Sequence, residues 1–170
     1  MQSIRSLLPA ANTDANVLIL GSMPGVRSLE AGQYYAHPRN DFWPLIFLVL
    51  RESDPFDYDA RIAVLLQHKI ALWDVIGECE REGSLDKNIK AAVPNDIRGF
   101  LKTHPSIKTI CFNGTTARRT YFAHFPAQDD IAYLLLPSSS PVPRRHIRTR
   151  EDKLPKWLEI RQHLGQGKET

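Results

Sequence analysis

The segment 33–44, QYYAHPRNDFWP, gathers four aromatic rings and several hydrogen-bonding side chains into twelve positions. The ring of Tyr35 or Phe42 offers a flat face on which an extruded nucleic-acid base could stack, for about 1–3 kcal/mol. The amide of Asn40 can hold a water molecule, because it donates and accepts hydrogen bonds at the same time. Alternatively, Phe42 and Trp43 are simply the first core residues of a helix. The segment therefore predicts either a site for a base and a water molecule or an ordinary loop and helix start.

Four loops rich in Gly, Ser, Pro or Asn each follow a short apolar run: 21–25 (GSMPG), 74–77 (DVIG), 113–115 (NGT) and 137–141 (PSSSP). If these runs are parallel strands of one sheet, the loops meet at its carboxyl edge, where such sheets bind ligands. The two glycines of the first loop let main-chain N–H groups approach a bound oxygen. That loop is too short for a dinucleotide fingerprint and lacks the Lys-Ser/Thr pair of a P-loop. No nucleotide cofactor is therefore expected.

Short apolar runs and amphipathic stretches alternate along the chain. The expected strands, nearly all apolar as in strands covered on both faces, are Val17–Leu20, Ile70–Trp73, Thr109–Phe112 and Tyr133–Leu136. The expected helices are Phe42–Leu50, Ala60–Gln67, Asp96–Thr103, Thr116–Ala123 and Leu154–Leu164. This alternation predicts an α/β fold, a three-layer α/β/α sandwich around a central, mostly parallel four-stranded sheet. Residues 1–170 are expected to form a single domain whose last few residues are a disordered tail.

The formal charge of +3 is unevenly distributed. Residues 1–96 carry 9 basic and 13 acidic side chains, whereas residues 97–170 carry 13 basic and 6 acidic ones. An arginine cluster follows the Ser/Pro loop directly and comprises Arg144, Arg145, Arg148 and Arg150. Such a basic face suits contact with a phosphate backbone, although arginines beside a helix start can equally be plain solvated surface.

Composition excludes several classes of protein. Hydrophobic residues make up 42% of the chain, which is too many for a disordered protein, and no apolar run reaches the ~20 residues that span a bilayer. The first eight residues do not form a secretory signal. Cys79 and Cys111 are too few for a disulfide framework or a four-cysteine metal site. A reducing interior is expected, in the cytoplasm and at the nucleoid if the source is bacterial.

Five motifs occur in one order between residues 4 and 164: LILGSMPG at 18–25, YYAHPRNDFW at 34–43, LWDVI at 72–76, FNGTTA at 112–117 and LPSSSP at 136–141. Together they resemble the uracil-DNA glycosylase superfamily. Among its branches the chain is most similar to the hypoxanthine-DNA glycosylases, also called DNA-deoxyinosine glycosylases. The resemblance covers nearly the whole chain and implies the α/β/α fold of that superfamily.

The resemblance assigns roles to individual residues. Asn40 takes the catalytic role, while Tyr35 stacks on the flipped base. Met23 stands where mismatch-specific uracil glycosylases have a water-positioning asparagine, and methionine cannot do that work. The residues implied in base binding are Gly21, Ser22, Met23, Tyr35, Phe42 and Asn113.

The serine loop is expected to contact DNA. Its residues Ser138, Ser139, Ser140 and Pro141 suit phosphates flanking a flipped nucleotide, and its prolines stiffen a wedge that could fill the vacated stack. Arg144 and Arg145 would then hold the backbone. The alternative is a rigid surface turn. The acidic segment Glu78–Asp86 has no role that the sequence identifies.

The implied activity is DNA base-excision repair: flipping deoxyinosine, hydrolysing its N-glycosidic bond, releasing hypoxanthine and leaving an abasic site. The four rim loops contain no lysine, so a monofunctional glycosylase is expected rather than one that forms a Schiff base. Neither a metal nor a cofactor is expected, and the partner is DNA containing deaminated bases, bound by a monomer. Two alternatives remain: a uracil, xanthine or mismatch-specific glycosylase of the same superfamily, and a non-catalytic nucleic-acid-binding module.

Overall fold

A four-stranded parallel sheet forms the centre of the molecule, in a computed structural model that describes residues 2–165. The strand order is β3-β2-β6-β7, with bounds β2 (Val17–Gly21), β3 (Ile70–Asp74), β6 (Thr109–Asn113) and β7 (Ala132–Leu136). All three strand pairs are parallel, which confirms the predicted sheet. β2 is buried at every position because it lies inside the sheet and is covered on both faces.

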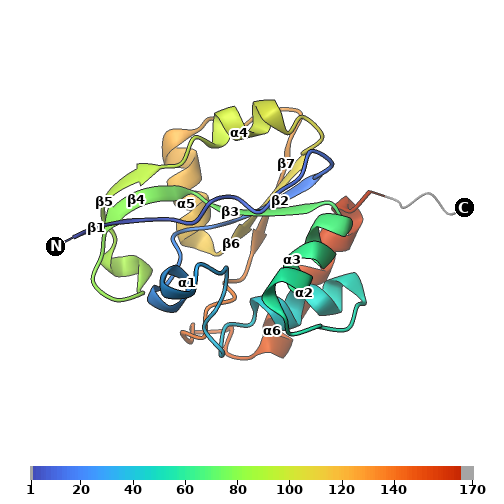
Figure 1. Cartoon of the computed structure of the whole chain (residues 1–170), viewed down its shortest axis with the longest axis horizontal. Helices are drawn as coiled ribbons and strands as arrows, with labels where there is room; N and C mark the ends of the chain where they lie inside the picture. Colours follow the sequence, from blue (N-terminus) through green and yellow to red (C-terminus); the bar gives the residue numbers. More distant parts are fainter. Residues whose placement is uncertain (1, 166–170) are drawn as a thin grey trace, which may run out of the picture.

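Helices cover both faces of this sheet (Figure 1). One face carries α2 (Phe42–Leu50), α3 (Tyr58–Gln67) and α6 (Arg150–Leu158), and the other carries α4 (Ile97–Thr103) and α5 (Thr115–His124). Alternate side chains of β2 divide between the two cores: Ile19 packs towards α2, and Leu18 packs towards α5. The predicted three-layer α/β/α sandwich is therefore confirmed.

The last helix begins four residues before its predicted start. Thr149 caps it, since its hydroxyl accepts a hydrogen bond from the Asp152 N–H at 3.2 Å and the Asp152 carboxylate accepts one from the Thr149 N–H at 3.0 Å. This capping box stabilises the first turn. After Leu158 the chain continues as a 3₁₀ helix, Glu159–His163. The expected disordered tail falls on 166–170, outside the described residues.

A second, antiparallel sheet was not predicted. It has the order β1-β4-β5, with β1 (Ser3–Arg5), β4 (Ile76–Glu80) and β5 (Lys90–Pro94). Only Val75 separates β3 from β4, so the expected rim loop 74–77 is instead the passage of the chain from one sheet to the other. These strands escaped prediction because β1 has only three residues and because β4 and β5 mix polar and apolar residues and pair with two register shifts.

Two further short helical segments also differ from expectation: α1 (Val26–Ala31) and the 3₁₀ turn Asp86–Asn88. Both flank the loop after β2. Over residues 2–165, no helix combines the length and the apolar character needed to cross a membrane.

Candidate active site

Gly21 ends β2 and lies opposite Asp74, the last residue of β3. A Cβ added to Gly21 would lie 2.5 Å from Asp74 Oδ1 and 3.2 Å from Tyr35 Oη. Glycine is therefore required here, because it leaves room for two polar side chains to close over the strand end. The predicted base-binding residues Gly21 and Tyr35 are brought together, whereas Asp74 joins them without having been predicted.

Tyr35 is held in an unusual conformation. Its backbone has φ 55°, a left-handed value that costs a tyrosine energy and is frequent at functional sites. Its ring stacks on Phe42 with centroids 4.0 Å apart and planes 16° apart. Phe42 itself is fully buried and packs against Trp157. It therefore supports the Tyr35 ring from below and exposes no surface of its own to a base. Burial, and then the charge of Asp74, raise the pKa of the Tyr35 phenol, which therefore stays neutral.

Asn40 lies in the turn that leads into α2. Its side-chain Oδ1 accepts a hydrogen bond from the Phe42 N–H at 2.9 Å, and its own N–H donates to the His37 carbonyl at 2.9 Å. The amide is thus fixed in orientation and half-exposed. No hydrogen bond joins its Nδ2 to another side chain or carbonyl in the described part of the chain, so this donor is free to meet a water molecule.

Asp41 ties the Asn40 turn to the serine loop. Its N–H donates to the Ser139 carbonyl at 2.9 Å, and its carboxylate accepts from Lys153 Nζ at 2.8 Å and Arg150 Nε at 3.1 Å. Lys153 is only 5% exposed and also donates to the Ser140 carbonyl at 3.1 Å. Sequence reasoning missed this connection, because an isolated aspartate and an isolated lysine 112 residues apart carry no local signal.

Asn113 is bonded to the serine loop at both ends of its amide. Nδ2 donates to Ser139 Oγ at 2.8 Å, and Oδ1 accepts from the Ser139 N–H at 2.8 Å. Ser139 was predicted to contact DNA, but it is only 1% exposed and its polar groups bond to Asn113 inside the protein. Ser138 packs against Gly114, whose φ of 100° and 3.1 Å clearance admit no side chain, and its Oγ accepts from the Ser140 N–H at 3.2 Å. The predicted residues of β6 and of the serine loop therefore form one rigid unit.

The acidic segment acquires a structural role. From just beyond β4, Arg81 Nη2 donates to the Pro24 carbonyl at 2.5 Å, and Asp86 accepts from Ser22 Oγ at 2.7 Å. Both contacts fix the loop 21–25, in which Ser22 was predicted to bind the base. Met23 is 6% exposed and belongs to a small apolar cluster, which leaves its main chain as its only polar part.

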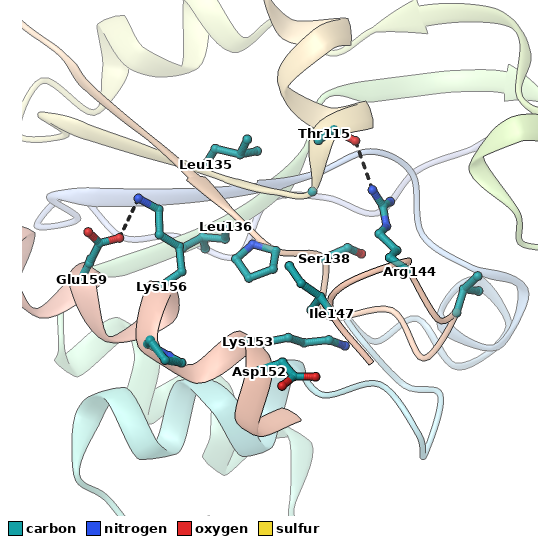
Figure 2. A pocket seen from close by; sticks show the side chains of 14 residues that line it. Thr115, Leu135, Leu136, Ser138, Arg144, Ile147, Asp152, Lys153, Lys156 and Glu159 are labelled. Carbon is teal, nitrogen blue, oxygen red and sulfur yellow. Dashed lines mark hydrogen bonds and ion pairs between the residues drawn. The ribbon is translucent and has the colours of Figure 1, made fainter. Parts of the chain in front are cut away.

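Two cavities flank the loop that follows β7. One of about 570 Å³ lies between this loop, the start of α5 and α6. Figure 2 shows Arg144 reaching across it to Thr115, where Nη1 donates to Oγ1 at 3.3 Å. The other, of about 420 Å³, is strongly polar and is lined in part by Arg39, Ser140, Arg148 and Arg150. Arg39 was not predicted, yet it brings a cation from the Asn40 turn to the arginine cluster.

The loop tip carries an exposed apolar side chain. Val142 lies between Pro141 and Pro143, is 51% exposed and borders both cavities. Arg144 and Arg145 follow it and are also exposed. Within residues 2–165, no group of three or more His, Cys, Asp or Glu side chains is arranged to hold a metal ion.

Comparison with known families decides the identity of the fold. The model of the uracil DNA glycosylase superfamily matches residues 8–164. The chain belongs to the uracil DNA glycosylase superfamily. It is therefore a DNA N-glycosylase, a hydrolase of N-glycosidic bonds.

Three relatives within the superfamily are similar over most of their length. A hypoxanthine DNA glycosylase of Methanosarcina acetivorans is 35% identical over 153 residues, 88% of this chain and 92% of that one. A hypoxanthine DNA glycosylase of Methanosarcina barkeri is 35% identical over 144 residues, 84% of this chain and 90% of the other. A solution NMR structure from Methanosarcina acetivorans, described as a candidate uracil DNA glycosylase, superposes with a TM-score of 0.78 at 32% identity and covers 96% and 99% of the two chains. The predicted superfamily and its hypoxanthine branch are both confirmed.

Proposed function

We propose that this glycosylase acts on deoxyinosine in DNA, releasing hypoxanthine and leaving an abasic site. The observation that carries the proposal is the fixed Asn40 amide in the same loop as the stacked Tyr35 ring, a loop that Asp41 joins to the serine loop. Support comes from the relatives named hypoxanthine DNA glycosylases, which match most of the chain.

Asn40 positions the attacking water in this proposal. The Phe42 N–H holds Oδ1, so rotation of the amide is restricted and Nδ2 points away from the helix end. An amide is too weak a base to remove a proton before the glycosidic bond has stretched, so its contribution is orientation of the water towards C1′. The positive charge that develops on the sugar is stabilised by the negatively charged phosphates of the DNA itself.

The flipped base would enter at the strand ends of β2 and β6. The Tyr35 ring, backed by Phe42, supplies the stacking surface, while the main-chain groups of Ser22 and Met23 supply donors and acceptors. Asn113 uses one N–H and one oxygen lone pair in its bonds to Ser139. Its second N–H and second lone pair are left for the base. Hypoxanthine has O6 as acceptor and N1–H as donor, whereas adenine has the reverse. Mispaired buried groups cost about 1–3 kcal/mol each, which discriminates against adenine.

The loop after β7 holds the DNA. Val142 at its tip is the apolar side chain placed to fill the vacated stack. The polar cavity beside it brings Arg39, Arg148 and Arg150 next to Ser140, which suits a backbone phosphate. Arg144 and Arg145 extend this basic surface.

The enzyme is monofunctional in this proposal. Lys153 is the lysine bound to the Asn40 turn, and its ammonium group is engaged by the Asp41 carboxylate and the Ser140 carbonyl. A nitrogen held in this way cannot attack C1′ to form a Schiff base. Strand cleavage would therefore require later treatment of the abasic site.

The test uses matched oligonucleotide duplexes containing deoxyinosine, uracil or xanthine, incubated with the protein and then treated with alkali. We expect strand breaks at deoxyinosine after alkali and intact strands before it. Breaks confined to uracil would move the substrate to the other branch of the superfamily, and breaks without alkali would contradict the monofunctional mechanism.

A further inference from the structure

Two buried side-chain oxygens near Gly21 lack hydrogen-bond partners in the described part of the chain. Asp74 is 3% exposed, and its Oδ2 and the Tyr35 Oη have no hydrogen-bond partner among residues 2–165. Both side chains close on the space that a Gly21 Cβ would occupy. Buried polar atoms without hydrogen-bond partners are rare, because they cost free energy. These two oxygens are therefore available to bond a ligand.

Asp74 lies on the face of the sheet that carries the site. Asp74, Gly21 and Asn113 end the neighbouring strands β3, β2 and β6. Two residues before Asp74, Leu72 packs in the apolar core below Tyr35 and Phe42, and side chains two apart on a strand share a face. The Asp74 carboxyl group and the Asn113 amide therefore lie on the same face of the sheet, at the strand ends on either side of Gly21.

The surroundings favour the neutral carboxylic acid. Burial, followed by the negative charge of Asp86, raises the pKa of Asp74 to about 7, and the Arg81 guanidinium opposes this rise without cancelling it. The other ionisable groups facing it are Tyr34 and Tyr35, both phenols whose pKa is raised by burial. Arg81 directs its Nη2 to the Pro24 carbonyl. None of the salt bridges among residues 2–165 involves Asp74.

We propose that Asp74 is a further catalytic residue, whose neutral carboxyl group donates a hydrogen bond to the flipped base as it departs. The inference rests on the proposed function for the presence of a base at these strand ends. Hypoxanthine offers O6, N7 and N3 as acceptors, and breaking the glycosidic bond moves negative charge onto all of them. A hydrogen-bond donor that is already oriented in a water-excluded site stabilises that charge and lowers the activation barrier for bond cleavage. Once ionised, the same group no longer donates, and its charge opposes departure.

The experiment is a single-turnover rate profile with the deoxyinosine duplex, from about pH 5.5 to about pH 9. For the unmodified enzyme we expect a rate that falls above about pH 7 as Asp74 loses its proton. Asp74→Asn keeps a neutral donor, so it should retain the rate within about threefold and lose this alkaline fall. Asp74→Ala removes the donor and should be at least about 30-fold slower at pH 6.

Asp86→Asn is the second variant, because it leaves Asp74 in place. Removing the Asp86 charge makes ionisation of Asp74 easier, so the alkaline fall should move to lower pH. A role in packing alone would not produce that shift. Circular dichroism melting confirms that each variant is folded before rates are compared.

The inference is overturned if Asp74→Ala stays within about threefold of the unmodified enzyme, or if Asp74→Asn keeps the same alkaline fall. An unmodified enzyme that releases hypoxanthine with no such fall also overturns it, and leaves the proposed function standing. If uracil or xanthine is released instead, the deoxyinosine assignment fails and the same profile on that base decides the role of Asp74. Release of no base at all would overturn both.

Discussion

At the scale of single residues, the site depends on side chains whose polar groups are only partly satisfied. Asn40 uses its oxygen to hold the start of α2 and leaves its nitrogen free within the described chain. Tyr35 and Asn40 could be predicted from sequence because they lie within one short motif. The position of Asp74 could not, because it is defined only when the end of β3 pairs with β2 at Gly21 and the side chain becomes buried.

Replacing Asn40 with alanine removes the amide proposed to position the water, together with its hydrogen bond to the Phe42 N–H. The single-turnover rate on deoxyinosine should fall at least about 100-fold, while stability should fall by about 1 kcal/mol. Binding of the duplex, measured by fluorescence anisotropy, should change by less than about threefold. Asn12→Ala, an exposed asparagine before the amino end of β2, is the control with unchanged rate. A rate for Asn40→Ala close to that of the control would transfer the role to another residue.

Replacing Asp74 with asparagine should stabilise the protein at high pH. The folded pKa of about 7 lies above the ordinary value of 3.8, so the folded state binds the proton more tightly and loses stability as pH rises between those values. Asparagine has no such loss. Urea unfolding should show a variant more stable by about 2–4 kcal/mol at pH 8, with a difference that shrinks towards pH 4. A difference that is the same at both pH values would show that Asp74 ionises normally.

At the scale of elements, α6 joins the two halves of the site. Its capping box places Lys153 one turn in from the amino end, where it reaches both the Asn40 turn and the serine loop. Sequence patterns predicted this helix from its apolar residues but placed its start at Leu154, one residue after Lys153. The four-residue cap, Thr149 to Asp152, was the available signal for the true start.

Lys153→Met removes that link and leaves Asp41 with the partly exposed Arg150. We expect a loss of about 1–3 kcal/mol in the free energy of unfolding, because the Asp41 carboxylate is mostly buried. The single-turnover rate should also fall, since within the described residues only the main-chain bond from Asp41 to Ser139 then holds the Asn40 turn to the serine loop. Lys156→Met on the same helix breaks only a half-exposed pair with Glu159 and should cost less than about 0.5 kcal/mol. Equal losses in the two variants would contradict the proposed link.

Across the whole molecule, the arginine cluster lies at the edge of the sheet where the candidate site is. The basic residues after position 97 include the exposed arginines of the loop after β7, beside the carboxyl edge of the parallel sheet. The parallel sheet could be predicted because its strands are almost wholly apolar. The antiparallel sheet could not, since its strands mix polar and apolar residues and are recognisable only by their partners. It carries the acidic segment, whose Arg81 and Asp86 hold the loop after β2.

Neutralising Arg144 and Arg145 to glutamine should make DNA binding less sensitive to salt. Each lost phosphate contact lowers the slope of log K against log salt by about 0.9, so loss of both contacts lowers it by about 1.8. Arg98→Gln with Lys102→Gln on α4 makes the same change in net charge away from the loop and should leave the slope near its original value. Equal slopes for the two double variants would place the DNA elsewhere.

The proposed reaction of the whole protein is hydrolysis of the glycosidic bond of deoxyinosine. The most direct measurement is mass-spectrometric detection of the free base released from a deoxyinosine duplex in excess enzyme. We predict one equivalent of free hypoxanthine, an abasic strand of full length, and no detectable adenine from the matched undamaged duplex. Failure to release hypoxanthine by an enzyme that binds the duplex would rule out this reaction.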